Sequence, residues 1–431
     1  MIPMNRIRFP EQERWPFLCQ RPVQEQENLL AQVQPVLQRV KEQGDEAVLA
    51  YTKEWDGVQL VQLAYAVPSK AALEQQLPQD LTAAIQTAYQ NIERFHRTQV
   101  ASPKLVETMP GVTCWRKALP IERVGLYVPG GTAPLFSSLL MLGIPASIAG
   151  CSTIVVATPP RKDGTIDPAI LYVARLLDID QVYAMGGAQA VAAMAYGTKS
   201  VPQVDKIFGP GNQYVTAAKQ MVQQEGVSID MPAGPSEVLV IADAGADPDF
   251  VAVDLLSQAE HGPDSQVILL SDNEEVLDAV EQSLAEQLED LPRKDIAWQA
   301  LSHSRSILLA SIEECIAFSN AYAPEHLILN GDDARAWADR ITNAGSVFIG
   351  PYSCESAGDY ASGTNHTLPT NGYARAYSGV SVDSFVKQVT FQELTTEGIR
   401  NLGPAIETMA AAEQLAAHER AVSIRLQKLH S

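Results

Sequence analysis

The feature that most constrains the fold is an alternation of short β-rich runs with apolar helical segments along most of the chain. In a first series we expect strands at 123–128, 153–158, 181–185 and 206–208, and helices at 137–148, 169–177, 188–196 and 212–224. In a second series we expect strands at 238–242, 266–270, 306–309, 327–329 and 346–349, and helices at 250–260, 274–288 and 312–320. Such alternation is typical of parallel, doubly wound sheets. We therefore expect an α/β fold with two doubly wound, incomplete Rossmann-like domains.

Both ends of the chain have helical patterns instead. Apolar residues recur at three- and four-residue intervals within 23–54, 81–97 and the tail 397–429. We expect four parts in the following order: a helical N-terminal region at 1–108, a first α/β domain at 109–235, a second α/β domain at 236–380, and a C-terminal helical arm at 381–431. A terminal helical arm of this kind commonly packs on a partner subunit or on its own core.

Composition narrows the class of protein. A chain of 431 residues with 46% hydrophobic content is long and apolar enough for a large globular enzyme. Acidic residues outnumber basic ones by 51 to 31, which disfavours nucleic acid as a partner. The first residues lack the apolar run of a secretory signal, and no stretch is long enough to cross a membrane. We expect a cytoplasmic protein that binds neither nucleic acid nor membrane.

The cysteines support the same compartment. There are five, an odd number, and they are scattered without a Cys-x-x-Cys pair, as expected in a reducing cytosol without a thiolate metal site. Cys151 follows an apolar helical stretch and invites comparison with a thiohemiacetal nucleophile. Small buried cysteines are much commoner than nucleophilic ones, so we interpret Cys151 as core packing.

Three glycine-rich turns follow expected strands of the first series. They read Pro-Gly-Gly at 129–131, Gly-Gly-Ala-Gln at 186–189 and Gly-Pro-Gly-Asn at 209–212. Such turns let backbone amides approach a phosphate at a helix N-terminus, although none completes Gly-x-Gly-x-x-Gly, because Tyr214 stands where the third glycine would be. Ordinary turns are the alternative. Tyr127, Gln189 and Asn212 are the candidate dinucleotide contacts beside them.

Gln258 and His261 are three residues apart at the end of the helix expected at 250–260, so they share a face and could reach one ion. A glutamine alone is a poor zinc ligand, and the segment is not His-Glu-x-x-His. The alternative is a plain helix end, in which Gly262 is the cap and His261 complements the helix dipole.

Glu325 and His326 stand next to each other at the entrance to an expected strand. Because adjacent residues of an extended chain point to opposite sides, we expect them to act in different steps. Histidine is the usual general base for an alcohol, and a glutamate can activate water.

A polar, glycine-punctuated loop at 356–366 supplies two further candidates, Asp359 for a metal and His366 for a substrate oxygen. In the C-terminal tail, Glu413 and His418 are expected on one helix, about 140° apart around its axis. Either they approach a substrate from two sides, or one of them is only solvated.

Taken together, these segments resemble the histidinol dehydrogenase family. The matching stretches are VGLYVPGG at 124–131, GGAQA at 186–190, IFGPGN at 207–212, DMPAGPSE at 230–237, SQAEHG at 257–262, PEHL at 324–327 and the loop at 356–366. The resemblance extends from about residue 30 to the C-terminus, and so many ordered motifs are not a coincidence.

The resemblance implies a set of site residues. Zinc, or in its place manganese, would be held by Gln258, His261, Asp359 and His418, with His418 delivered from the other subunit of a homodimer. Glu325 and His326 would be the acid–base pair. The implied NAD contacts are Tyr127, Gln189 and Asn212, in the first α/β domain. The implied substrate contacts, mostly in the second, are Ser236, Gln258, His261, His326, Asp359, His366, Glu413 and His418.

The resemblance also implies a reaction, the oxidation of L-histidinol to L-histidine through bound histidinal with two NAD⁺ and one water, which ends histidine biosynthesis. His326 would take the alcohol proton, and Glu325 would activate water in the second step. Two rivals from other classes remain: a metal hydrolase in which Glu325 activates a metal-bound water, and a non-catalytic NAD-binding regulator.

Overall fold

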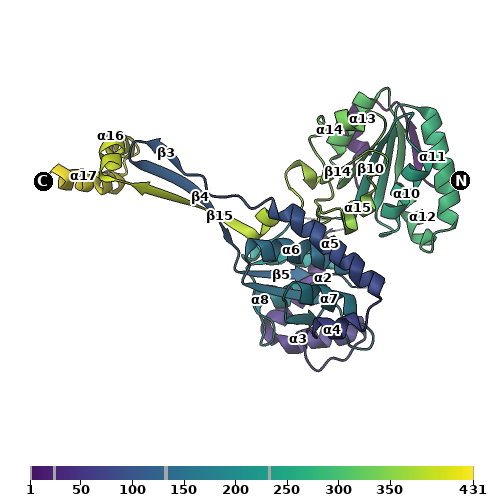
Figure 1. Ribbon diagram of the computed structural model, residues 1–431, viewed down its shortest axis with the longest axis horizontal. Helices are drawn as coiled ribbons and strands as arrows, with labels where there is room; N and C mark the ends of the chain where they lie inside the picture. The colour runs from purple at the N-terminus through teal and green to yellow at the C-terminus, as the bar shows by residue number, and fades with distance from the viewer. Residues whose placement is uncertain (1, 23–25, 131–133, 232–233, 431) are drawn as a thin grey trace.

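The computed structural model describes residues 2–22, 26–130, 134–231 and 234–430, and Figure 1 shows two α/β units with a long arm standing away from them. Strands within the described ranges form two six-stranded sheets and one three-stranded sheet. The other ten residues (1, 23–25, 131–133, 232–233 and 431) lie outside the described residues, and they include the start of the helical range expected from residue 23, the last residue of the turn at 129–131 and two residues of the stretch at 230–237.

The first sheet has the strand order β2-β7-β6-β5-β8-β9. Its strands are β2 (Ala64–Ala66), β5 (Arg123–Tyr127), β6 (Thr153–Thr158), β7 (Gln181–Ala184), β8 (Lys206–Phe208) and β9 (Ser228–Ile229). All neighbours are parallel except β2 and β7. The parallel strands carry apolar side chains on both faces, because helices cover both.

Each face of the first sheet has its own core. One face packs against α4 (Lys70–Glu74), α5 (Gln79–Arg97), α6 (Phe136–Ala149) and α7 (Pro168–Leu176). The other packs against α2 (Gln26–Gln43), α3 (Asp45–Tyr51), α8 (Gly187–Tyr196) and α9 (Gln213–Gln224). Cys151 packs at the edge of the first core, and burial raises the pKa of its thiol to about 11, which fits a packing role.

The second sheet has the order β1-β12-β11-β10-β13-β14 and is parallel throughout. Its strands are β1 (Asn5–Arg8), β10 (Glu237–Ala242), β11 (Gln266–Ser271), β12 (Arg305–Leu308), β13 (His326–Asn330) and β14 (Ser346–Ile349). One face is covered by α10 (Pro248–Ala259), α11 (Glu274–Glu289) and α12 (Lys294–Ser302), and the other by α1 (Trp15–Leu18), α13 (Ile312–Tyr322) and α14 (Ala334–Ala338). The expected doubly wound α/β fold is confirmed.

The N-terminal region is less purely helical than expected. β1 adds an edge strand to the second sheet by pairing with β12, whereas β2 adds an antiparallel edge strand to the first. Both strands are short, so neither gives the alternating pattern by which strands are found in sequence. A short π-helical turn, Thr52–Asp56, follows α3.

The arm combines a sheet with two helices (Figure 1). Strands β3 (Val106–Met109), β4 (Val112–Pro120) and β15 (Val386–Leu394) form an antiparallel sheet, and α16 (Thr396–Ala412) and α17 (Ala416–His430) follow at its far end. The expectation of one continuous helix over 397–429 is therefore wrong: Glu413 caps α16 and Gln414 has a left-handed φ of 59°. Glu413 and His418 do not share a helix.

Two features of the described residues concern the sequence-based expectations about membrane-spanning segments and cysteine pairing. Among them, no helix has the length and apolar character that a membrane crossing requires. All five cysteines are free thiols.

Candidate active site

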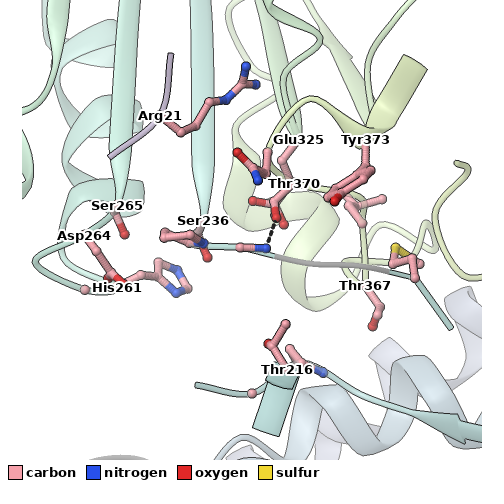
Figure 2. A pocket seen from close by; sticks show the side chains of 18 of the residues that line it. Arg21, Thr216, Ser236, His261, Asp264, Ser265, Glu325, Thr367, Thr370 and Tyr373 are labelled. Atoms are coloured by element: carbon pink, nitrogen blue, oxygen red, sulfur yellow. Dashed lines mark hydrogen bonds between the residues drawn. The ribbon is translucent and has the colours of Figure 1, made fainter. Parts of the chain in front are cut away.

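A cavity of about 1540 Å³ opens between opposite edges of the two large sheets. Its first wall comes from turns after β5 and β8, represented by Pro129 and Gly209, at the carboxyl edge of the first sheet. Its second wall comes from residues just before or at the start of β10, β11 and β13, at the amino edge of the second sheet. Figure 2 shows Ser236, Ser265 and Glu325 on the second wall, with Thr216 of α9 across the gap.

Glu325 and His326 lie together on the second wall and are both almost fully buried. Glu325 Oε2 accepts a hydrogen bond of 2.9 Å from the backbone N–H of Glu237, and His326 Nδ1 lies 3.1 Å from the Glu237 carbonyl oxygen. A carbonyl oxygen only accepts, so Nδ1 carries a proton in this contact. Nε2 is therefore the nitrogen through which His326 can exchange a proton with a group in the cavity.

The two side chains are closer than the sequence analysis expected. Glu325 Oε2 lies 3.7 Å from His326 Nδ1, so they do not point to opposite sides. The reason is local: β13 begins at His326, and Glu325 precedes the extended segment, which leaves its side chain free to turn toward Glu237.

The environment of this pair shifts both titrations. Burial raises the pKa of Glu325 to about 8. Burial favours the neutral form of His326, but the carboxylates of Glu325, Glu355 and Asp359 outweigh it and raise the pKa of the imidazole to about 10. Three carboxyl groups thus surround one imidazole, and the site is short of positive charge.

A group of possible metal ligands stands next to the pair. His261, Glu355 and Asp359 each offer a ligand atom, and these atoms lie within 4.8 Å of one another. Asp359 Oδ1 is buried without a hydrogen-bond partner and lies 3.4 Å from His326 Nε2. Burial lowers the pKa of His261, which favours the neutral imidazole that binds a cation.

Gln258, from the last turn of α10, lies beside this group with its side chain buried. Its amide is satisfied when the nitrogen faces Glu355, 2.6 Å from Oε1 and 3.2 Å from Oε2, since the opposite orientation sets an amide oxygen against a carboxylate. Glu355 begins α15 (Glu355–Tyr360), a short helix that extends into the stretch expected to be a loop. Sequence reasoning missed Glu355, which stands one residue outside the polar segment that drew attention.

Two further predicted residues line the cavity. His366 Nδ1 lies 2.9 Å from the Asp359 carbonyl oxygen, and its Nε2 lies 3.2 Å from Ser138 Oγ of α6, so it links the second unit to the first. Ser236 stands immediately before β10, in the same wall as Glu325.

The opposite wall contains the turn at 209–212. Gly209 has a φ of 121°, and a Cβ there would lie 2.0 Å from the Tyr127 carbonyl oxygen, so only glycine fits. Buried Lys219 donates to the Gly209 carbonyl at 2.9 Å and pairs with Asp230, whose carboxylate accepts from the Gly209 N–H at 2.8 Å. Sequence reasoning missed this support: Lys219 stands outside the quoted motifs, and Asp230, although it begins the stretch at 230–237, was given no role.

The three predicted dinucleotide contacts lie in different places. Asn212 lines the cavity and caps α9 by accepting from Tyr214 and Val215 N–H groups. Tyr127 and Gln189 are buried behind the wall; Tyr127 Oη accepts from the Gly187 N–H at 3.1 Å and so supports the second glycine turn. Neither of these two lines the cavity.

Glu413 and His418 are not brought to this cavity. Both lie on the arm, exposed, at the junction of α16 and α17. Within one chain, the described structure gathers the other predicted metal and substrate residues without them.

Comparison with known proteins agrees with this arrangement. The family model described as histidinol dehydrogenase matches residues 19–426. Histidinol dehydrogenase of Bacteroides fragilis is 54% identical over 426 residues, which cover 99% of this chain and 100% of that protein. The chloroplastic enzyme of Arabidopsis thaliana is 55% identical over 94% of this chain and 87% of its own. The crystal structure of histidinol dehydrogenase from Elizabethkingia anophelis aligns with a TM-score of 0.97 at 56% identity, covering both chains completely.

The fold, the cavity and these matches define an enzyme of the NAD-dependent oxidoreductase class. More narrowly, the chain belongs to the histidinol dehydrogenase family. The resemblance inferred from the sequence motifs is confirmed.

Proposed function

We propose that this chain oxidises L-histidinol to L-histidine through bound L-histidinal, using two NAD⁺ and one water. The observation that carries the proposal is the buried Glu325–His326 pair, which opens on a cavity beside the His261, Glu355 and Asp359 donors. An acid–base pair next to a cation site, with glycine turns opposite, suits oxidation of an alcohol that also carries nitrogen ligands.

The chain's own residues divide the proton transfers. His326 Nε2 takes the hydroxyl proton of histidinol while a hydride leaves the carbon for the nicotinamide. Glu325 then takes a proton from the water that attacks the histidinal carbonyl carbon, and His326 returns its proton to the carbonyl oxygen, which completes the hydrate and leaves His326 able to act as a base again. His326 takes the proton of the resulting hydrate as the second hydride leaves. Glu325 suits the middle step because burial raises its pKa to about 8, which makes its carboxylate a stronger base than an exposed one.

The donor set fits a zinc ion. Imidazole and carboxylate ligands suit zinc, and manganese could take the same set. The partnerless Asp359 Oδ1 and the excess of buried carboxyl groups are both satisfied by a cation. We propose Gln258, His261 and Asp359 as ligands from one subunit, with Glu355 holding the Gln258 amide so that its oxygen is free to bind. Zinc would hold the imidazole and amine of the substrate and orient it for the base.

The glycine turns fit a dinucleotide. The close approach of Gly209 to the Tyr127 backbone leaves no room for a side chain, and the N-terminus of α9 lies directly beyond it. Asn212 would contact the dinucleotide directly. Tyr127 and Gln189 would act from behind the turns.

We further propose a homodimer whose subunits share the active site. His418 would complete the zinc ligands of the partner's site, and Glu413 would contact its substrate. Both are exposed on an arm that stands away from its own cavity, and apolar side chains near them, Met409, Leu415 and Ile424, are exposed as well. A second copy of the chain would cover these apolar groups.

The first test is NADH formation from histidinol and NAD⁺, with two NADH expected per histidinol and loss of turnover after a chelator removes the metal. Hydrolysis of an ester or amide without NADH would favour the metal hydrolase. Nucleotide binding without turnover would favour the regulator.

The second test separates the acid–base roles. His326→Asn should impair both oxidations, whereas Glu325→Gln should slow the oxidation of added histidinal more than the oxidation of histidinol. Equal loss of both half-reactions in Glu325→Gln would contradict the division of labour.

A further inference from the structure

Glu237 connects the two proposed proton-transfer residues through its backbone. Its N–H holds the Glu325 carboxylate at 2.9 Å, and its carbonyl oxygen holds His326 Nδ1 at 3.1 Å. The position of this one peptide segment, at the first residue of β10, therefore sets both the direction of the carboxylate and the tautomer of the imidazole. Contacts that hold the backbone of Glu237 in place therefore also hold the side chains of Glu325 and His326.

The Glu237 side chain is fixed by Arg21. Arg21 Nε donates to Glu237 Oε1 at 2.9 Å and Nη2 donates to Oε2 at 2.8 Å, a two-pronged contact with side-chain exposures of only 8% and 1%. The Asn371 N–H also donates to Oε1, at 2.6 Å. A planar guanidinium that meets a carboxylate at two points fixes its orientation as well as its charge.

Arg21 is itself held on several sides. Its Nη1 donates to the Cys19 carbonyl at 3.0 Å, its Nη2 also reaches the Ala323 carbonyl at 3.3 Å, and its guanidinium carbon lies 3.6 Å from the ring centre of Tyr322. Arg21 borders the cavity, but its guanidinium nitrogens all donate hydrogen bonds to protein oxygens. In Figure 2, Arg21 lies on the side of Ser236 that faces the second sheet. It is placed to hold Glu237, and not to bind a ligand.

We propose that Arg21 and Glu237 form a positioning pair for the reaction, which aligns Glu325 and His326 without touching substrate or cofactor. The pair ties the N-terminal segment before residue 23 to the start of β10 and so makes that segment part of the catalytic apparatus. The inference rests on the proposed roles of Glu325 and His326.

The direct test is Arg21→Met, which keeps much of the side-chain length and removes the two hydrogen bonds from the guanidinium to Glu237. A misplacement of about 1 Å at catalytic groups costs up to about 100-fold in rate, so we expect kcat to fall by about 10- to 100-fold. KM for histidinol and for NAD⁺ should change less than about threefold, because the substitution leaves ligand contacts in place. Arg21→Lys keeps the charge but loses the two-pronged geometry and should lie between Arg21→Met and the unmodified enzyme.

A compensated variant separates positioning from charge burial. Arg21→Met leaves a buried carboxylate without its partner and will lower the unfolding temperature; adding Glu237→Gln removes that uncompensated charge and should restore stability. If the pair positions the acid–base groups, kcat of the stable double variant stays at least about tenfold below that of the unmodified enzyme, because no guanidinium holds the amide introduced at position 237. Recovery of kcat together with stability would show a merely structural pair and overturn the proposal.

Two further outcomes are decisive. Arg21→Met with a raised KM and unchanged kcat would assign Arg21 to ligand binding and overturn the proposal. The matched control Arg340→Met, which breaks the exposed Arg340–Glu313 pair of the same unit, should change neither constant. If His326→Asn retains turnover, the proposed function fails; if His326→Asn is inactive and Arg21→Met is fully active, only this inference fails.

Discussion

Replacing Glu355 tests whether this carboxylate positions Gln258 or binds the metal itself. Its oxygens lie 2.6 and 3.2 Å from the Gln258 amide nitrogen. A hydrogen bond to a charged group contributes about 1.5–3 kcal/mol, which corresponds to about 10- to 100-fold in a binding constant. Glu355→Ala should therefore weaken zinc binding by that factor, because the Gln258 oxygen is no longer held toward the ion. Glu355→Gln can form a neutral bond and should lose about tenfold.

The assay is competition for zinc between the metal-free protein and a fluorescent chelator. Burial raises the pKa of Glu355 to about 8, so the competition is run above that pH, where its carboxyl group is ionised. Glu260→Gln is the matched control, since it removes one negative charge beside His261 instead of beside Gln258. It reports the loss of charge alone.

Three results would refute the reasoning. Unchanged affinity in Glu355→Ala would mean that Glu355 does not orient Gln258. A loss of zinc affinity in Glu355→Gln that is no larger than in Glu260→Gln would mean that the loss of one negative charge accounts for the whole effect. A loss in Glu355→Ala as large as that in Asp359→Asn would make Glu355 a metal ligand.

Three other predictions follow from the geometry. Mixing His418→Ala with His261→Ala subunits should restore about a quarter of the specific activity at equal amounts, because half of the dimers are mixed and each has one intact site; no recovery in proven heterodimers would contradict the shared site. Gly209→Ala, whose Cβ would lie 2.0 Å from a backbone oxygen, should raise KM for NAD⁺ at least about tenfold in steady-state kinetics, and unchanged nucleotide affinity by titration calorimetry would refute the turn's role. Burial lowers the pKa of His96 below that of an unfolded chain, so the unfolded state binds the extra proton and the free energy of unfolding falls as pH drops through about 6.5. His96→Gln should flatten this pH dependence of the free energy of unfolding, measured by urea titration, whereas His303→Gln, at an exposed position, should not. An equal pH dependence in the two variants would refute the prediction.

The strand-and-helix alternation predicted the two large sheets because buried parallel strands must be apolar on both faces. The arm could not be predicted in the same way. β4 and β15 are paired along nine residues but expose much of both faces, so polar residues such as Lys117 and Gln388 interrupt any hydrophobic period. The break between α16 and α17 depends on a left-handed Gln414, a residue type that gives no turn signal.

The site was predictable where chemistry and motif coincide, and not elsewhere. His261, Asp359 and His326 each stand in a segment that matches a family motif, and the structure brings them into one cavity. Arg21 and Glu355 give no such signal, because arginines and glutamates are ordinarily surface residues and only tertiary packing buries them. Residues that hold the reacting groups in place are thus the ones that sequence reasoning misses.

The polarity of the two sheets explains why the holding residues are needed. The first sheet turns its carboxyl edge to the cavity, where glycine turns and helix N-termini can receive phosphates. The second turns its amino edge, where strands begin with N–H groups that the sheet has not yet paired, and the Glu237 N–H is used to hold the Glu325 carboxylate. At an amino edge, the first N–H group of a strand can donate one hydrogen bond to a carboxylate, but no helix N-terminus stands there to add further donors. The position of the first strand residue must therefore be fixed by other contacts. The buried Arg21–Glu237 contact meets that requirement, which is why a side chain distant in sequence from every motif bears on the proposed chemistry.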